Sequence, residues 1–398
     1  MKTLDDLDLK GKRIFLRVDF NTPLDAQRRV ADDTRIRAIM PTLQKAIEKG
    51  GKVFLASHLG RPKGKVVPEM SLKPVAERLS ELLGKTVPLA PDCIGEAVKN
   101  QAADVGEGDA LLLENLRFHA GEEKNDPDFA RQLADLADVY INDAFAVSHR
   151  AHASVHGILD YVKECAAGYQ LQKEMEYFRS AFEHPRRPLA MIIGGAKVST
   201  KIGLLENLIP KADCLLIGGA MANTFLKAQG REVGKSLVED DFLDTARSLL
   251  EKGKARGIKI LLPVDAVAAP RLEANVTGVC EVSVDGIPPD LMILDVGPKT
   301  VEIYESALRE SASIIWNGPL GAFETPPFHK ATFAIAELLG SLPALTVIGG
   351  GDSAAAVKAA GVARKVSYVS TGGGAFLELL EGKTLPGVAK LEECMGRA

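Results

Sequence analysis

The chain has 398 residues, of which 46% are hydrophobic and 26% charged, and its formal net charge is −4. That length exceeds what one hydrophobic core usually holds, so we expect two domains of about 150 to 200 residues each. The slightly acidic balance excludes a general affinity for nucleic acid, so any anion site must be local. Acidic residues at the N-terminus and the lack of any apolar run near about 18 residues predict a cytoplasmic protein with no membrane segment.

The cysteines are odd in number, widely spaced, and contain no CxxC pair. Such a pattern is typical of reduced thiols in a cytosolic protein. We therefore expect no disulfide among the five, which are Cys93, Cys165, Cys214, Cys280 and Cys394.

In the first half, strand-like apolar runs near residues 15, 55, 113 and 140 alternate with helical patterns. This alternation predicts βα units and a mainly parallel sheet. Ligands of such sheets bind at the carboxyl ends of the strands, so the residues that follow each run are the candidates for function.

Cationic side chains follow several of these runs. After the first run, Thr34 is the expected N-cap of a helix, which places Arg35 in the first turn. The helix dipole disfavours a cation there unless an anion is bound, although a solvated surface arginine explains Arg35 equally well by itself. Arginines at several strand ends together predict a basin for a small anionic substrate. Its members are Arg35, His58, Arg61, Arg117 and Arg150.

Three histidines, His149, His152 and His156, are spaced as zinc ligands on one helical face could be. The presence of Arg150 among them and the absence of an HExxH glutamate disfavour zinc. We expect one histidine to serve as an anion donor and the others to pack.

Between the halves, apolar residues recur at helical spacing and two prolines, Pro185 and Pro188, follow them. The pattern predicts a long packed helix that connects two domains. Its apolar stripe consists of Leu171, Met175, Phe178 and Phe182.

The second half repeats a strand, glycine-turn, helix pattern four times, from Met191, Leu215, Leu345 and Tyr368. The third repeat reads LTVIGGGDSAAAV, and its Asp352 would repel a phosphate unless a cation lay between them. Taken alone, this stretch is more simply a tight turn with Asp352 as an N-cap. The repetition favours one cleft that binds a metal-bound nucleotide.

Other residues of the second half fit the same cleft. Lys197 and Lys201 follow a glycine turn and are expected to begin a helix, where phosphate contact would explain two cations. Glu324 is either a solvated loop acid or an acceptor for ribose hydroxyls. The run from Thr371 to Gly374 opens a helix whose N–H groups would face the cleft.

Two motifs are misleading. The stretch from Gly230 to Ser236 resembles a Walker A loop, but Gln229 stands where that motif needs glycine and a helical pattern precedes it. Gly349, Gly351 and Ala354 match the dinucleotide fingerprint GxGxxA only weakly, because no acidic residue follows at the required distance. A NAD-dependent oxidoreductase and a non-catalytic nucleotide-binding regulator remain as alternative functions.

A set of longer motifs occurs in order along the chain: RVDFN, SHLGRPKG, LLENLRF, NDAF with HRAHAS, GGAKVSTKI, LIGGAMANTFLK, LDVGPKT, WNGPLGAFE, GGGDS and STGGGA. On these motifs the chain resembles the phosphoglycerate kinase family from end to end.

The resemblance implies an α/β fold of two doubly wound parallel-sheet (Rossmann-like) domains joined by a connecting helix. Residues 1–170 would bind 3-phosphoglycerate, residues 171–186 would form the connecting helix and hinge, and residues 187–384 would bind the nucleotide. The tail, about 385–398, would pack back on the first domain.

The implied enzyme is a cytoplasmic, monomeric phosphotransferase of glycolysis and gluconeogenesis that closes about its hinge. Its reaction would be reversible transfer between 1,3-bisphosphoglycerate and MgADP, giving 3-phosphoglycerate and MgATP. The resemblance implies Mg²⁺ as the cofactor, no tightly bound organic cofactor, and no nucleic-acid or membrane partner.

The resemblance also assigns residues. Substrate would be bound by Asp19, Phe20, Asn21, Arg35, His58, Leu59, Gly60, Arg61, Arg117 and Arg150. The nucleotide would be bound by Lys197, Lys201, Gly218, Gly219, Asn317, Pro319, Glu324, Gly350, Gly351, Asp352 and Ser353, with Asp352 at the metal. The transferring phosphoryl group would be stabilised by Arg35, Lys197 and the amides of Gly372, Gly373 and Gly374. Ser353 and Ile293 depart from the common pattern.

Overall fold

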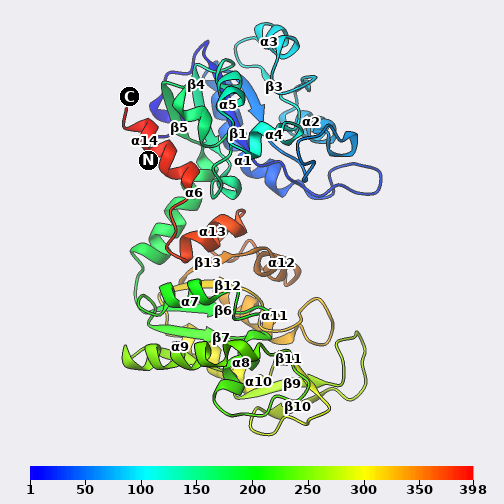
Figure 1. Cartoon of the computed structure of the whole chain (residues 1–398), viewed down its shortest axis with the longest axis vertical. Coiled ribbons are helices and arrows are strands. Elements are labelled where there is room, and N and C mark those ends of the chain that lie inside the picture. Colours follow the sequence, from blue (N-terminus) through cyan, green and yellow to red (C-terminus); the bar gives the residue numbers. More distant parts are fainter. Residues whose placement is uncertain (398) are drawn as a thin grey trace. The chain divides into compact units, whose positions relative to one another are not determined.

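The computed structural model of the chain describes residues 1–397 (Figure 1). The chain divides into two compact units: Met1–Met175 with Thr384–Ala398 form the first, and Glu176–Lys383 form the second. Of the helices within residues 1–397, none has both the length and the apolar character needed to cross a bilayer.

The first unit contains a five-stranded parallel sheet in the order β3-β2-β1-β4-β5. Its strands are buried along nearly their whole length, as expected when helices cover both faces of a parallel sheet. The strands are β1 (Arg13–Val18), β2 (Lys52–Ala56), β3 (Ala110–Leu112), β4 (Val139–Asp143) and β5 (Glu164–Ala167).

Helix α1 illustrates how the sequence pattern positions the site. It buries Ile36, Ile39 and Leu43 at helical spacing, so its first turn is held against the sheet. The helix begins at Thr34 with Asp33 as the N-cap, one residue earlier than the predicted cap. The helices of this unit are α1 (Thr34–Glu48), α2 (Lys73–Leu83), α3 (Glu96–Ala103), α4 (Ala120–Glu123), α5 (Pro127–Ala134) and α14 (Pro386–Met395).

The second unit contains a six-stranded parallel sheet in the order β14-β13-β12-β6-β7-β8. The predicted α/β class with parallel sheets is therefore confirmed. The strands of this sheet are β6 (Leu189–Ile193), β7 (Cys214–Ile217), β8 (Lys259–Leu261), β12 (Ser313–Asn317), β13 (Leu345–Gly349) and β14 (Tyr368–Val369). The helices are α7 (Ile202–Leu208), α8 (Met221–Ala228), α9 (Leu243–Ala255), α10 (Pro298–Arg309), α11 (Lys330–Leu339), α12 (Gly351–Ala359) and α13 (Gly373–Leu380).

A second, smaller sheet in this unit was not predicted. It is antiparallel, in the order β10-β9-β11, and a register shift between Ile293 and Asp295 interrupts the pairing of its last strand. Its strands are β9 (Asp265–Ala269), β10 (Cys280–Ser283) and β11 (Met292–Val296).

Helix α6 (Tyr169–Phe178) contains the boundary between the two units and continues into a π-helical turn, Arg179–Glu183. The four residues of its predicted apolar stripe are all buried. The expectation of a packed helix in this stretch is therefore confirmed.

The start of α6 is held by Asp143, which lies at the carboxyl end of β4. The Oδ1 atom of Asp143 accepts hydrogen bonds from the backbone N–H groups of Gln170 (2.8 Å) and Leu171 (3.0 Å). These are first-turn donors that no helical carbonyl can reach. A Cβ at Gly168 would lie 2.2 Å from Cγ of Asp143, so the close approach requires glycine there. Burial raises the pKa of Asp143 to about 7.

We expect Asp143→Asn to change how stability depends on pH. Since the pKa of Asp143 is higher in the folded than in the unfolded chain, the folded chain binds an extra proton between about pH 4 and 7. Stability of the native chain therefore falls as pH rises through this range, by up to about 4 kcal/mol by linkage. The asparagine side chain does not titrate, so the variant should gain stability relative to the native chain as pH rises from about 4 to 7, as measured by urea unfolding. A constant difference across this range would contradict the assignment.

The cysteine prediction is wrong for one pair. Cys165 in β5 and Cys394 in α14 form a disulfide, and both are buried. They are 229 positions apart in the sequence, and only the packing of α14 against β5 brings them together. The remaining cysteines, Cys93, Cys214 and Cys280, are free thiols.

Candidate functional site

In the first unit, the residues after β1 form an ion pair with the start of α1 and hydrogen bonds with the loop after β2. The guanidinium of Arg35 forms an ion pair with the carboxylate of Asp19. Oδ1 of Asn21 accepts a hydrogen bond from the backbone N–H of Gly60 at 2.9 Å. The side chain of Phe20 is fully buried, and its N–H donates to Oγ of Ser57. These contacts join two neighbouring strand ends into one surface.

The loops after β2 and β3 meet in the same way. Nη1 of Arg117 donates to the backbone carbonyl of Gly60 at 3.0 Å, and Asn115 donates to the carbonyl of Leu59 at 2.8 Å. Arg117 is almost completely buried, and burial lowers its pKa from the ordinary value. Among the described residues, its one ion pair is a 3.5 Å contact with Glu123. A buried guanidinium with so little compensation is well suited to an anionic ligand.

His58 lies among these cations. It is 3% exposed, and its Nδ1 atom has no hydrogen-bond partner among the described residues. Burial, followed by the positive charges of Arg17, Arg117 and Arg35, lowers its pKa well below the ordinary value. The imidazole is therefore neutral at physiological pH and could act as a hydrogen-bond donor or acceptor.

Two predicted members of the basin, Arg150 and Arg61, have fewer contacts with its other residues. Nε of Arg150 donates a hydrogen bond to Nε2 of His149 at 3.1 Å. The positive charge of Arg150 contributes to lowering the pKa of both Arg117 and His152. Arg61 is exposed, and no contact joins its side chain to the other basin residues within the described chain. The structure thus brings together Asp19, Asn21, Arg35, His58, Gly60 and Arg117, with Arg150 within electrostatic range, and leaves Arg61 at the surface.

The three histidines form no metal site in the part of the chain that the structure describes. Burial and the charge of Arg117 lower the pKa of His152 to about 3, so it is neutral. His156 contacts the side chain of Asn125 at 3.3 Å.

Sequence reasoning missed a buried charge network beneath the basin. Arg17 in β1 is fully buried and donates from Nε to Oγ of Ser154 at 2.8 Å. Glu122 is also fully buried and accepts from the N–H and Oγ of the same serine, at 2.9 and 2.6 Å. Burial raises the pKa of Glu122, while the charge of Arg17 opposes that shift. The one available signal was Arg17, which interrupts the apolar run from Ile14 to Val18.

In the second unit, the glycine turns pack against one another along the edge of the sheet. Gly219, after β7, has φ +68°, and a Cβ there would lie 2.6 Å from the backbone of Gly195, after β6. A Cβ at Gly194 would lie 2.0 Å from the carbonyl oxygen of Pro319, after β12. A Cβ at Gly373, after β14, would lie 3.1 Å from the nitrogen of Gly351, after β13. The turns therefore lie along one surface, as their repetition in the sequence predicts.

Side chains bind the turns to each other. Lys201 contacts Oδ1 of Asn317, whose Nδ2 donates to the carbonyl of Gly349 at 2.9 Å. Oγ of Ser353 accepts a hydrogen bond from the N–H of Gly318 at 2.6 Å. Burial lowers the pKa of Lys201, while Asp352 and Glu381 oppose the shift.

The position of Lys197 differs from the prediction. Helix α7 begins only at Ile202, so Lys197 lies in an exposed turn after β6 and Lys201 is the N-cap. The turn is fixed by Ser199, whose N–H donates to Glu239 at 3.0 Å. A lysine on an exposed turn can move its ammonium group toward a ligand more freely than a helical one.

Helices α12 and α13 begin at these turns. Helix α12 has Gly350 as its N-cap, and α13 has Gly372 as its N-cap with Gly373 and Gly374 in its first turn. Their unsatisfied backbone N–H groups form an anion-binding edge. Asp352 is an exposed carboxylate in the first turn of α12.

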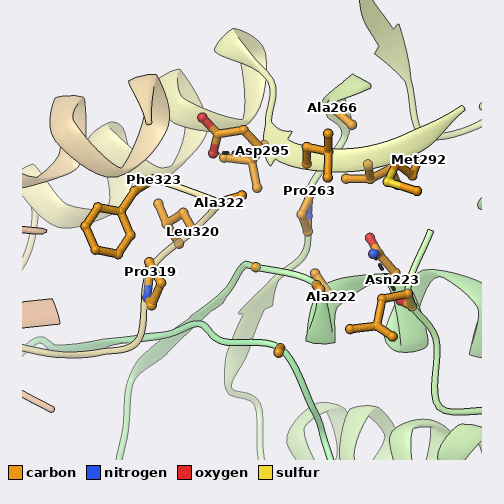
Figure 2. Close-up of a pocket in the computed structure, with 18 of the residues that line it drawn as sticks. Ala222, Asn223, Pro263, Ala266, Met292, Asp295, Pro319, Leu320, Ala322 and Phe323 are labelled. Atoms are coloured by element: carbon orange, nitrogen blue, oxygen red, sulfur yellow. Dashed lines mark hydrogen bonds between the residues drawn. The ribbon is translucent and has the colours of Figure 1, made fainter. Parts of the chain in front are cut away.

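A cavity of about 590 Å³ opens beside these turns (Figure 2). Its lining includes the predicted residues Gly219, Pro319, Glu324 and Asp352. Gly218 is not among the lining residues; a Cβ there would lie 2.3 Å from the side chain of Leu320, so its role is to allow packing. The lining also contains apolar side chains that no motif predicted, among them Leu237, Leu272 and Met292, which we call the apolar wall.

Asn223 in α8 is a second residue that sequence reasoning missed. It lines the cavity yet is only 1% exposed. Its Nδ2 donates to the carbonyl of Leu237 at 3.2 Å, which fixes the orientation of the amide. Its Oδ1 has no partner among the described residues, so an N–H donor in the cavity would satisfy it. In Figure 2 this amide rises from α8 toward the strand that carries Met292.

One α/β unit carries cationic side chains at its strand ends. The other carries glycine turns and helix N-termini around a cavity. These are the features of a phosphotransferase. The family model described as phosphoglycerate kinase matches residues 4–383. The chain belongs to the phosphoglycerate kinase family. Members of this family are kinases of glycolysis, and the chain is accordingly a transferase.

Similarity to individual proteins extends over the whole chain. It is 67% identical over 398 residues to the phosphoglycerate kinase of Syntrophobacter fumaroxidans, with 100% of both chains covered. It is 56% identical over 394 residues to that of Anaeromyxobacter sp. strain Fw109-5, covering 98% of this chain and 99% of the relative.

Solved structures agree. The chain is similar to phosphoglycerate kinase from Coxiella burnetii, with a TM-score of 0.91, 42% identity and 98% of each chain covered. It is also similar to the enzyme from Pyrococcus horikoshii, with a TM-score of 0.85, 29% identity and 100% of each chain covered.

Proposed function

We propose that the chain catalyses reversible phosphoryl transfer between 1,3-bisphosphoglycerate and MgADP, giving 3-phosphoglycerate and MgATP. The observation that carries the proposal is the row of glycine turns beside the 590 Å³ cavity, which can hold a nucleotide with its phosphates at the helix N-termini. Family membership supports the identity of both substrates.

The first unit is proposed to bind the glycerate substrate at the basin formed by Arg35, His58, Arg117 and Arg150. Asp19 and Asn21 would orient this surface through their bonds to Arg35 and Gly60. Arg61 would reach the substrate from its exposed position. Arginine matches carboxylate and phosphate oxygens bidentately, which suits a substrate that carries both groups.

The second unit is proposed to bind the nucleotide. The base would lie against the apolar wall of the cavity, where Oδ1 of Asn223 can accept an N–H donor. Glu324 would accept from ribose hydroxyls, and Lys197 and Lys201 would contact phosphates together with the amides of Gly350 to Ser353. Gly218 would contribute only by its packing.

The donor set fits Mg²⁺ bound with the nucleotide. Asp352 supplies an exposed carboxylate at the cavity, and magnesium in kinases is commonly held by one or two carboxylates plus substrate phosphates. When bound, the ion would neutralise negative charge on the phosphates.

The attacking atom in either direction is an oxygen that is already ionised, a phosphate oxygen of ADP or the carboxylate of 3-phosphoglycerate. No general base is needed. The residues instead stabilise charge on the transferring phosphoryl group, a role proposed for Arg35, Lys197 and the amides of Gly372 to Gly374.

Because the two substrates bind to different units, transfer requires the units to close about the α6 segment. Closure would also exclude water and limit hydrolysis. We further propose a cytoplasmic monomer, on the basis of the family and of the composition.

A coupled assay tests the proposal. The chain is supplied with MgATP and 3-phosphoglycerate, and a phosphorylating glyceraldehyde dehydrogenase reports 1,3-bisphosphoglycerate through NADH oxidation. Turnover that requires Mg²⁺ and both substrates is the expected result. Absence of turnover in folded protein that still binds MgADP would mean that the basin serves a different acid.

A further inference from the structure

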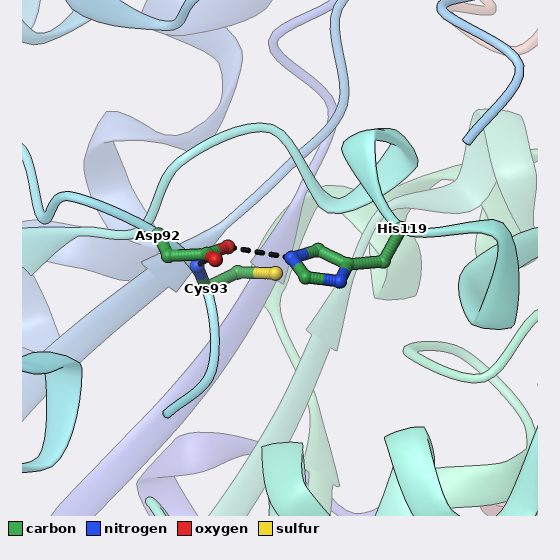
Figure 3. A group of neighbouring side chains, drawn as sticks. All are labelled: Asp92, Cys93 and His119. Carbon is green, nitrogen blue, oxygen red and sulfur yellow. Dashed lines mark hydrogen bonds and ion pairs between the residues drawn. The ribbon is translucent and has the colours of Figure 1, made fainter. Parts of the chain in front are cut away.

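A group of three potential metal ligands lies in the first unit, apart from the residues assigned to substrate. One ligand atom from each of Asp92, Cys93 and His119 lies within 4.8 Å of the others (Figure 3). Asp92 and Cys93 belong to the segment that follows the bridge between Leu89 and Leu112 of β3, and His119 is the N-cap residue of α4.

Contacts already hold these side chains in place. Oδ1 of Asp92 accepts from Nε2 of His119 at 2.6 Å and from the backbone N–H of Cys93 at 2.7 Å. The imidazole of His119 also stacks on Phe129, with ring centroids 5.3 Å apart. Ligands that are oriented in advance lose little entropy when an ion binds.

The surroundings of the group suit a cation. Cys93 is fully buried, and the carboxylates of Asp92 and Glu122 lie within electrostatic range of its thiol. Negative charge of this kind attracts a divalent cation, which would in turn stabilise the thiolate. The side chains of His119 and Asp92 are 30% and 44% exposed, which leaves a path from solvent.

We propose that Asp92, Cys93 and His119 bind a zinc ion through the thiolate Sγ, a ring nitrogen and a carboxylate oxygen, with water as the fourth ligand. Thiolate, imidazole and carboxylate are the ligands that Zn²⁺ prefers, and four-coordination with one water is typical when the protein supplies three. The S–H bond of Cys93 breaks and its proton goes to solvent, the single N–H proton of the neutral His119 ring resides on the nitrogen that does not bind the metal, and the Sγ–metal bond forms without any redox change.

The ion would connect the segment before α3 to the start of α4. Because α4 also carries the buried Glu122, binding should stabilise the first unit against unfolding. Mg²⁺ should not compete, since it prefers a set of oxygen ligands.

The test is a titration of the full chain with Co²⁺, a spectroscopic substitute for Zn²⁺, with excess Mg²⁺ present. We expect one equivalent to bind with a thiolate-to-metal charge-transfer band, and Zn²⁺ to remove that band. Cys93→Ser should abolish the band. His119→Gln keeps a hydrogen-bond donor for Asp92 but lacks the imidazole, and it should weaken binding by at least about tenfold. Cys280→Ser, at a half-buried thiol of the second unit, is the matched control and should leave the titration unchanged.

Three outcomes would overturn the proposal: no charge-transfer band in the native chain, a band that survives Cys93→Ser, or a band that disappears in Cys280→Ser. If Cys93→Ser does not fold, the test relies on His119→Gln, because His119 is partly exposed. An unchanged affinity of His119→Gln for Co²⁺ would then count against the site. Thermal unfolding gives an independent measurement, because Zn²⁺ should raise the Tm of the native chain but not that of His119→Gln.

Discussion

Lys197→Ala should lower turnover by about 100- to 1,000-fold, the usual effect of removing one donor that stabilises transition-state charge. Lys197 lies on an exposed turn after β6, and its ammonium group is not needed to hold the fold. Nucleotide affinity should change much less than turnover, because the apolar wall and the amides at the helix N-termini remain. Steady-state kinetics and MgADP titration measure the two effects separately.

Lys227→Ala is the matched control for this variant. Lys227 is also a lysine of the second unit, but it forms a surface ion pair with Asp240 at 2.7 Å and lies outside the cavity lining. It should retain native turnover, since surface ion pairs contribute little. Native turnover in Lys197→Ala would remove that residue from its proposed role.

Arg35→Ala should reduce turnover by about 100-fold or more and also weaken binding of 3-phosphoglycerate. Arg35 is paired with Asp19 in the first turn of α1, where the helix dipole disfavours a cation unless an anion is bound. Loss of the guanidinium would leave the Asp19 carboxylate without its partner, next to an anionic substrate.

Arg37, two residues further along α1, provides the control. Its side chain is 57% exposed and pairs with Asp33 at 2.9 Å, so Arg37→Ala should behave almost as the native enzyme. If Arg35→Ala loses only affinity, with kcat unchanged at saturating substrate, Arg35 is a binding residue and has no part in the transfer step.

The strand ends and glycine turns could be predicted because they follow local rules. An apolar run predicts a buried strand, and in a parallel sheet the residues after each run share one edge. This reasoning placed Arg35 and Arg117 on one surface, and it placed Gly219 and Gly350 on another. The same local rules were less accurate at helix starts, where α7 begins five residues after Lys197.

Other features depend on contacts between distant residues and could not be predicted. The Arg17–Ser154–Glu122 network joins β1 to residues more than 100 positions away, and neither charge is paired locally. The apolar cavity wall includes Leu237 and Leu272, which are exposed loop residues that follow no periodic pattern. The antiparallel β10-β9-β11 sheet has short strands, and most residues of its outer strands β10 and β11 are only partly buried or exposed.

The disulfide between Cys165 and Cys394 changes how the chain would transmit mechanical force. Tension applied to the two ends would pass from residue 165 directly to residue 394, and so would bypass the whole of the second unit. Only the first unit would bear the load while the bond is intact. After reduction, the same tension would run through α6 and return through residue 384, so that the second unit would also be stretched.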